Sequence, residues 1–196
     1  PGAFEMLARY DPPPVVRMLL AYEARPEAGA RFTYHLATTF GALCGGERTV
    51  HLKALLDAKD PLLRVAGPVF LCFDDLGSGM TALKDLEALD GDPGAWAALT
   101  RARRGAKDSV PRALRLFEAA PAKEGEGDVR HLLQGKLIVL LSNSARAGGV
   151  PPLPWSRESE AAGATFDPLR GWWKENEARI QLVDPWLPLL EEKRSD

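Results

Sequence analysis

Few residues in this 196-residue chain have the type and spacing that catalysis requires. Asp74 and Asp75 form a carboxylate pair that could bind a cation or act as acid and base. Adjacent residues on a helix do not face the same way, however, and negative charge is unfavourable at a helix C-terminus. We therefore expect a structural or solvated pair, with an N-cap for the following turn as one structural role.

Two glycine-rich stretches, Gly77-Ser78-Gly79 and the run from Gly41 to Gly46, could be taken for phosphate-binding loops. Neither follows a strand pattern or has the frame GxxxxGK followed by Ser or Thr. We predict that Gly77-Ser78-Gly79 is a tight turn between two helices. The chain has no GxSxG motif, and its histidines lie in helical patterns, so we expect no catalytic triad.

Metal binding and disulfide formation find little support in the sequence. The two cysteines, Cys44 and Cys72, do not form a CxxC pair, and the three histidines show no metal-ligand spacing. Both cysteines lie in apolar helical patterns, which favours two buried core residues and leaves a disulfide as the alternative. We predict no metal, no cofactor and no enzymatic activity.

A cluster of six basic residues is the strongest local charge feature, since the net charge of the whole chain is only −2. Its members are Arg101, Arg103, Arg104, Lys107, Arg112 and Arg115. The cluster could bind an acidic peptide, a phosphate or a nucleic-acid backbone, and the alternative is a solvated helix face. The near-neutral chain as a whole makes nucleic acid an improbable partner.

Apolar residues recur at helical spacing through most of the chain, and no alternating strand pattern is found. The widest stripe runs from Leu62 to Phe73, after Asp60 as N-cap and Pro61 in the first turn, and it contains Pro68, which should kink the helix. The other expected helices cover residues 14–24, 32–43, 50–56, 80–89, 96–103, 110–117, 129–147 and 168–176.

These helices come in pairs that nearly repeat. Asp60-Pro61 opens one pair, and Asp92-Pro93 opens another 32 residues later. Each opening is followed by a second apolar segment. A period near 32 with two helices per period is typical of an α-solenoid, which usually works by presenting a surface to a partner.

The opening Asp-Pro-x-x-Arg-Val-Ala at residues 60–66, its weaker echo at 92–98 and the short turns between helices resemble HEAT repeats. The similarity is greatest to the short bacterial HEAT-like repeats of the phycocyanobilin-lyase type, and it covers residues 29–120. It implies an armadillo-like helical fold that serves as a scaffold for protein binding.

The resemblance also implies roles for individual residues. The aspartate of each opening, Asp60 and Asp92, would cap the first helix of its pair. Arg64 would bridge neighbouring repeats, whereas the next unit has Trp96 at the corresponding position.

Residues 164–176 are similar to a segment that closes many bacterial HEAT-repeat proteins, with a Phe, a short capped helix and the pair Trp172-Trp173. The similarity implies a C-terminal cap, although Gly171 stands where a helix former is more usual. Four of the five tryptophans lie between residue 155 and the end of the sequence: Trp155, Trp172, Trp173 and Trp186. They could form an exposed recognition site, but sealing the last repeat of a solenoid is the favoured role.

We therefore predict an all-α protein, a right-handed α-solenoid of HEAT-like helix pairs with a Trp-rich C-terminal cap. The expected organisation is an N-terminal helical segment at residues 1–28, a solenoid at 29–147, and a Pro-rich loop with a capping helix at 148–196.

The predicted function is a non-catalytic scaffold that binds a protein partner through its concave helix layer, and an acidic segment of the partner is one candidate for the contact. The candidate partner-binding residues are Lys53, Lys84, Arg101, Arg104, Arg112 and Arg115. The alternatives are a HEAT-like enzyme, of bilin-lyase or DNA-glycosylase type, and a structural domain of a larger cell-envelope protein. No membrane-spanning stretch or signal peptide is visible, so a cytoplasmic location is favoured and a periplasmic one stays open.

Overall fold

The structure of the chain is a computed structural model. It describes residues 11–22, 38–39, 48–118, 129–155 and 165–184. Over these residues the regular elements are helices and no strand is found, which confirms the predicted all-α class. Most of the helix expected over residues 32–43 lies outside the described residues, as do Cys44 and Trp186.

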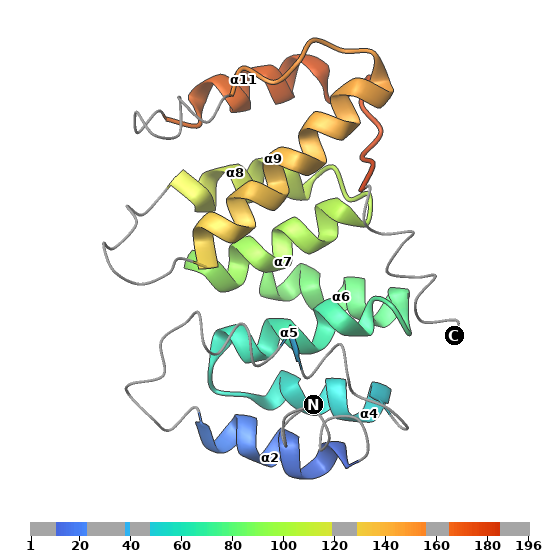
Figure 1. Ribbon diagram of the computed structural model, residues 1–196, viewed down its shortest axis with the longest axis vertical. Helices are drawn as coiled ribbons and strands as arrows, with labels where there is room; N and C mark the ends of the chain where they lie inside the picture. Colours follow the sequence, from blue (N-terminus) through green and yellow to red (C-terminus); the bar gives the residue numbers. More distant parts are fainter. Residues whose placement is uncertain (1–10, 23–37, 40–47, 119–128, 156–164, 185–196) are drawn as a thin grey trace. The chain divides into compact units, whose positions relative to one another are not determined.

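Contacts within the chain divide it into two compact units, Pro1–Ala88 with Lys123–Val129 and Leu89–Ala122 with Arg130–Asp196. We describe each unit separately. The helices of the first unit are α2 (Pro12–Tyr22), α4 (Arg48–Ala54), the 3-10 helix η1 (Leu55–Asp57), α5 (Pro61–Leu71) and α6 (Leu76–Leu86) (Figure 1). The helices of the second unit are α7 (Gly91–Arg103), α8 (Ser109–Glu118), α9 (Val129–Gly148) and α11 (Asp167–Asn176).

In the first unit, the predicted helix after Asp60 is present. Asp60 Oδ1 accepts hydrogen bonds from the backbone N–H groups of Leu62 at 2.7 Å and Leu63 at 3.3 Å, so the predicted N-cap is confirmed. Pro68 is buried inside α5, where it cannot donate the usual helical hydrogen bond. The buried part of the predicted stripe consists of Leu62, Val65, Ala66 and Val69.

The start of α6 differs from the sequence prediction. We expected Gly77-Ser78-Gly79 to be a turn, but α6 begins at Leu76 and contains all three residues in its first turns. The N-cap is Asp75, whose Oδ1 accepts a hydrogen bond from the backbone N–H of Ser78 at 3.0 Å. The structural role considered for Asp75 is therefore confirmed, and the turn lies before it.

The glycine at position 79 allows α6 to approach the end of α5. A Cβ atom at Gly79 would lie 2.6 Å from Sγ and 2.7 Å from the backbone nitrogen of Cys72. No real side chain fits at these distances, so the contact requires glycine. Cys72 itself is buried, which agrees with the core role predicted for it.

In the second unit, α7 begins earlier than predicted. Its N-cap residue is Asp90 and its first residue is Gly91, so Asp92 lies in the first turn and does not cap the helix. The carboxylate of Asp92 instead accepts a hydrogen bond from Nε of Arg130 at 3.0 Å. The helix dipole still stabilises an acidic residue in the first turn. The sequence pattern at Asp92 therefore resembled an N-cap.

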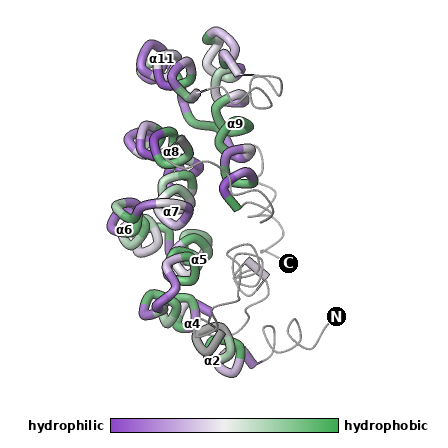
Figure 2. The backbone as a smooth tube through the Cα atoms, turned by 90° about the vertical axis from the view of Figure 1, so that its left-hand side faces the viewer, coloured by the Kyte–Doolittle hydropathy of each residue, from purple (hydrophilic) through white to green (hydrophobic). Residues whose placement is uncertain are grey.

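Helix α7 is enclosed on all sides, because every residue from Gly94 to Ala102 is buried. It forms an antiparallel hairpin with α8, and Gly105, with a φ of 95°, follows the end of α7. Figures 1 and 2 show α9 beside this hairpin and α11 beside α8. The hairpin is therefore the centre of the second unit.

The tryptophans of α11 belong to the core of this unit. Trp172 and Trp173 retain only 6% and 2% of their exposure, so they do not form the exposed recognition site considered as an alternative. Trp155 stacks on Phe166 with ring centroids 4.8 Å apart. This packing is consistent with a capping role.

Candidate binding groove along helix α9

Helix α9 has apolar residues on two of its faces. The inner face is buried and consists of Leu133, Leu137, Leu140, Leu141 and Ala145. The outer face consists of His131, Leu132, Gly135, Lys136 and Val139, all of them exposed. Leu132 and Val139 are 39% and 42% exposed. The outer face therefore combines two partly exposed apolar side chains with a histidine and a lysine.

Two side-chain contacts fix the rotation of α9 over the α7–α8 hairpin. Nε of Arg130 donates to Oδ1 of Asp92 at 3.0 Å on α7. Nε2 of Gln134 donates to the backbone carbonyl of Phe117 at 3.2 Å on α8. Because both contacts lie in the first half of α9, that half is held with its outer face away from the hairpin.

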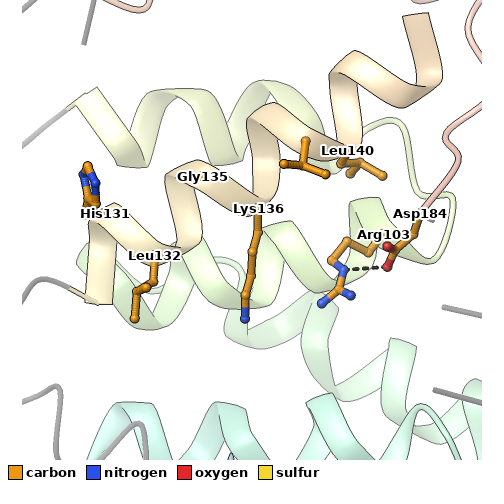
Figure 3. A pocket seen from close by; sticks show the side chains of 8 residues that line it. Arg103, His131, Leu132, Gly135, Lys136, Leu140 and Asp184 are labelled. Atoms are coloured by element: carbon orange, nitrogen blue, oxygen red, sulfur yellow. Dashed lines mark hydrogen bonds and ion pairs between the residues drawn. The ribbon is translucent and has the colours of Figure 1, made fainter. Parts of the chain in front are cut away.

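A pocket of about 580 Å³ opens against this outer face (Figure 3). Its lining residues are Arg103, His131, Leu132, Gly135, Lys136, Val139, Leu140 and Asp184. The volume lies within the range of about 300–1,000 Å³ that is usual for binding pockets. Figure 3 shows the side chains of Leu132 and Lys136 pointing to the same side of α9. Gly135 lies between them, and a Cβ atom there would have nothing within 4 Å, so glycine leaves the pocket open. We call this surface the α9 groove.

A buried ion pair closes one end of the α9 groove. Nε of Arg103 lies 2.6 Å from Oδ2 of Asp184, and the two side chains are 23% and 3% exposed. The preceding residue is fixed too, because the backbone N–H of Val183 donates to Oγ of Ser144 at 2.9 Å. The two charges of this pair compensate each other within the groove.

Intramolecular contacts occupy much of the predicted basic cluster. Arg101 is buried and its Nη2 lies 3.3 Å from Oδ2 of Asp108. Nζ of Lys107 donates to the backbone carbonyl of Glu177 at 2.9 Å. These contacts, with the pair of Arg103 and Asp184, show that part of the cluster stabilises the second unit.

The remaining predicted binding residues of the cluster differ in their surroundings. Nη2 of Arg112 donates to the backbone carbonyl of Leu89 at 3.2 Å and lies 3.4 Å from the carboxylate of Asp90. Arg104 is half-buried, and only Arg115 is exposed. Of the candidates in this cluster, Arg115 is therefore the one most available to a partner.

Three exposed basic residues recur at equal spacing along the chain. Lys53, Lys84 and Arg115 lie 31 residues apart, in the last turns of α4, α6 and α8 respectively. The first two belong to the first unit and the third to the second unit. A cation at a helix C-terminus is favourable by about 0.3–1 kcal/mol. The helix dipole accounts for each residue separately but not for the constant interval.

The acidic pair considered for catalysis has structural roles. Oδ2 of Asp74 lies 2.8 Å from Nε of Arg48, and Asp75 caps α6. Hydrogen bonds from the side chain and the backbone of Ser78 lower the pKa of Asp75 below its ordinary value. The carboxylate of Asp75 is therefore favoured in its ionised form by these hydrogen bonds.

Among the described residues, no group of three His, Cys, Asp or Glu side chains is placed to hold a metal ion. No helix within the described part of the chain is long and apolar enough to cross a bilayer. Arg64 is half-buried, and its Nε forms no hydrogen bond among the described residues, so its bridging role stays a prediction.

The α9 groove itself was missed in the sequence. Leu133, Leu137 and Leu140 form the buried stripe of α9, and Leu132 and Val139 lie outside it. Apolar residues beyond those needed for this stripe were the signal in the sequence that could have indicated the groove. The ion pair of Asp184 with Arg103 could not have been predicted from sequence spacing, since the two residues lie 81 positions apart. Comparison of the chain with protein-family models, with curated proteins and with solved structures finds no match.

Proposed function

We propose that this protein is a non-catalytic interaction module, an α-solenoid of HEAT-like helix pairs with a C-terminal cap at α11. In this proposal a protein partner with an acidic segment binds through the concave helix layer. The observation behind it is the series of exposed cations Lys53, Lys84 and Arg115, which lie 31 residues apart in the sequence, in the last turns of α4, α6 and α8 respectively.

The constant interval supports a repeated unit more directly than the two Asp-Pro openings do. Asp60 caps its helix whereas Asp92 lies within the first turn, so the openings are not structurally equivalent. A solenoid repeats the same position in each helix pair. Exposed cations at such positions would attract a partner segment with acidic residues, and the attraction would steer association.

The test begins with a partner obtained by cross-linking to the purified chain in an extract of the native cell and identified by mass spectrometry. Its affinity is then measured by calorimetry with both proteins purified. We expect Lys84→Glu and Arg115→Glu each to weaken the Kd about tenfold, equivalent to roughly 1.4 kcal/mol. The loss should shrink at high salt, because salt screens exposed charges beyond about 10 Å at 0.1 M.

Lys174→Glu is the matched control. Lys174 is also an exposed cation in the last turn of a helix, α11, but it lies outside the series of equal spacing. Its reversal should leave the affinity unchanged. The proposal is wrong if no protein is retained by the chain, or if the three reversals have the same effect.

A further inference from the structure

We propose that Asp90 and Gly91 form a site of spontaneous covalent modification, at which the carboxyl group of Asp90 closes onto the backbone nitrogen of Gly91 and the residue is converted to isoaspartate. The reaction needs only water as co-reactant. Its product has a free α-carboxylate, which makes the modified chain a substrate for enzymes that methylate isoaspartate. The inference is independent of the proposed function, because it concerns the link before α7 and requires no partner.

The conversion is balanced in two steps. The backbone nitrogen of Gly91 attacks Cγ of Asp90 and forms an N–C bond, the amide proton is lost, and one carboxyl oxygen leaves as water. The product is a five-membered succinimide ring. Water then adds to one of its two carbonyl carbons and opens the ring. Opening on one side restores aspartate, and opening on the other gives isoaspartate, in which the main chain runs through Cβ and Cγ.

The sequence favours this reaction at Asp90. Asp90-Gly91 is the only Asp-Gly pair of the chain, and Asn-Gly does not occur. Glycine has no Cβ atom to hinder the attack by its nitrogen. Proline has no N–H proton to lose, so this route is closed wherever proline follows aspartate. The aspartates that precede proline are Asp11, Asp60, Asp92, Asp167 and Asp184.

The local structure leaves both reacting groups accessible. The side chain of Asp90 is 98% exposed, and it makes no capping hydrogen bond although Asp90 is the N-cap residue of α7. Its carboxylate lies 3.4 Å from Nη2 of Arg112, and exposed ion pairs of this kind hold a side chain only weakly. Gly91 is the first residue of α7, so its N–H is one of the donors that have no partner within the helix.

Ring closure also requires the peptide group between Asp90 and Gly91 to rotate. The ψ of Asp90 is 163° and the φ of Gly91 is 70°. Glycine moves between positive and negative φ at no steric cost, and a helix end without a side-chain cap opens more easily than a buried core. The rotation is therefore possible by opening of the first turn of α7, without unfolding of the second unit.

Asp108-Ser109 is the matched comparison within the chain, since serine is also small. Here the backbone N–H of Ser109 donates to the carbonyl of Ala106 at 3.2 Å, and Ser109 is buried. The carboxylate of Asp108 lies 3.3 Å from Nη2 of Arg101. Both reacting groups are therefore held. Other aspartates that precede an N–H already bonded to a carbonyl are Asp57 and Asp74.

Isoaspartate at position 90 should disturb the start of the second unit. It inserts one CH2 group into the main chain between Leu89 and α7. The carbonyl of Leu89 accepts from Nη2 of Arg112 at 3.2 Å, and a Cβ atom at Gly94 would lie 1.8 Å from its oxygen. These contacts fix the chain just before the inserted group. We therefore expect the modified chain to have a lower Tm than the unmodified chain.

The experiment incubates the purified full chain for several weeks at physiological temperature and neutral pH. Isoaspartate is quantified by transfer of a labelled methyl group from S-adenosylmethionine, with a purified isoaspartate methyltransferase as the probe. Electron-transfer fragmentation of proteolytic peptides locates it in the sequence. We expect isoaspartate at Asp90 to exceed that at Asp108 by about tenfold or more, because the end of α7 opens more readily.

Three variants test the chemistry. Asp90→Glu keeps a carboxylate at this position but would have to form a six-membered ring, so it should remove the label from this peptide. Asp90→Asn should speed the reaction, because ammonia is a better leaving group here than water. Asp108→Glu is the matched control and should leave the label unchanged. Circular dichroism of each variant confirms that it folds.

A short peptide with the sequence of residues 86–95 gives the reference rate for an unfolded chain. If this peptide forms isoaspartate while the folded chain forms none over the same time, the structure protects the pair and the proposal is wrong. Label located mainly at Asp108 or another aspartate would also overturn it, as would an Asp90→Glu chain that accepts as much label as the wild type.

Discussion

Replacing Gly94 by alanine should destabilise the second unit, although alanine is the better helix former. A Cβ atom at Gly94 would lie 1.8 Å from the carbonyl oxygen of Leu89 and 2.8 Å from its carbon. That carbonyl cannot move without loss, because it accepts a hydrogen bond from Nη2 of Arg112 at 3.2 Å. The change therefore sets a backbone overlap against a gain in helix propensity.

The destabilisation by the overlap is larger than the gain in helix propensity. Overpacking costs about 1–3 kcal/mol, and the lost hydrogen bond costs about 1 kcal/mol. Helix propensity returns roughly 1 kcal/mol. We expect Gly94→Ala to lower the free energy of unfolding by about 1–3 kcal/mol.

Gly135→Ala is the matched comparison, because Gly135 lies in a helix of the same unit with no atom within 4 Å of a Cβ. It should raise the free energy of unfolding by about 0.5–1 kcal/mol. Urea unfolding followed by circular dichroism measures both changes in the same transition, and Tm should move by roughly 2–4 °C per kcal/mol. The reasoning is refuted if Gly94→Ala is as stable as Gly135→Ala.

Three further predictions concern capping, the buried ion pair and pH. Asp60→Ala should lower the free energy of unfolding by about 1 kcal/mol, measured by thermal unfolding. Asp60→Asn can still accept hydrogen bonds from the N–H groups of Leu62 and Leu63, so it should keep most of the stability of the wild-type chain. Arg103→Met leaves the carboxylate of Asp184 buried without its charge partner and should cost about 3–5 kcal/mol in urea unfolding. Adding Asp184→Leu should recover much of that loss, and equal stability of the single and double variants would contradict this account. The pKa of Asp75 is lowered, so its contribution to α6 is present above the ordinary carboxyl pKa and is lost as the pH falls through the lower folded value. A carboxyl titration by NMR should give that lowered pKa, and Ser78→Ala should raise it; an unchanged pKa would count against the hydrogen bonds as its cause.

Local patterns predicted most of the helices. Asp60, Pro61 and the stripe that follows gave the start of α5, because an N-cap and helical periodicity depend only on neighbouring residues. The same kind of signal was misinterpreted at Gly77-Ser78-Gly79. There the glycines serve a close contact with Cys72 and not a turn, and such a contact depends on how two helices pack.

The candidate site was less predictable because its partners are distant in sequence. Lys107 contacts the carbonyl of Glu177, and Arg103 contacts Asp184. A run of basic residues cannot reveal which of them a later segment will neutralise. In the same way, the apolar residues of α9 did not show that Leu132 would face solvent, since the inner stripe already sufficed for packing.

The enclosure of α7 has a consequence for how this sequence can change over time. From Gly94 to Ala102 no position faces solvent, and most of the side chains are small. A single substitution there must preserve volume, because a larger side chain has nowhere to go and a smaller one leaves a cavity. Larger changes in α7 require simultaneous compensating changes in the helices around it. We therefore expect the sequence of this helix to change slowly, while the exposed residues in the last turns of α4, α6 and α8 can vary without such compensation.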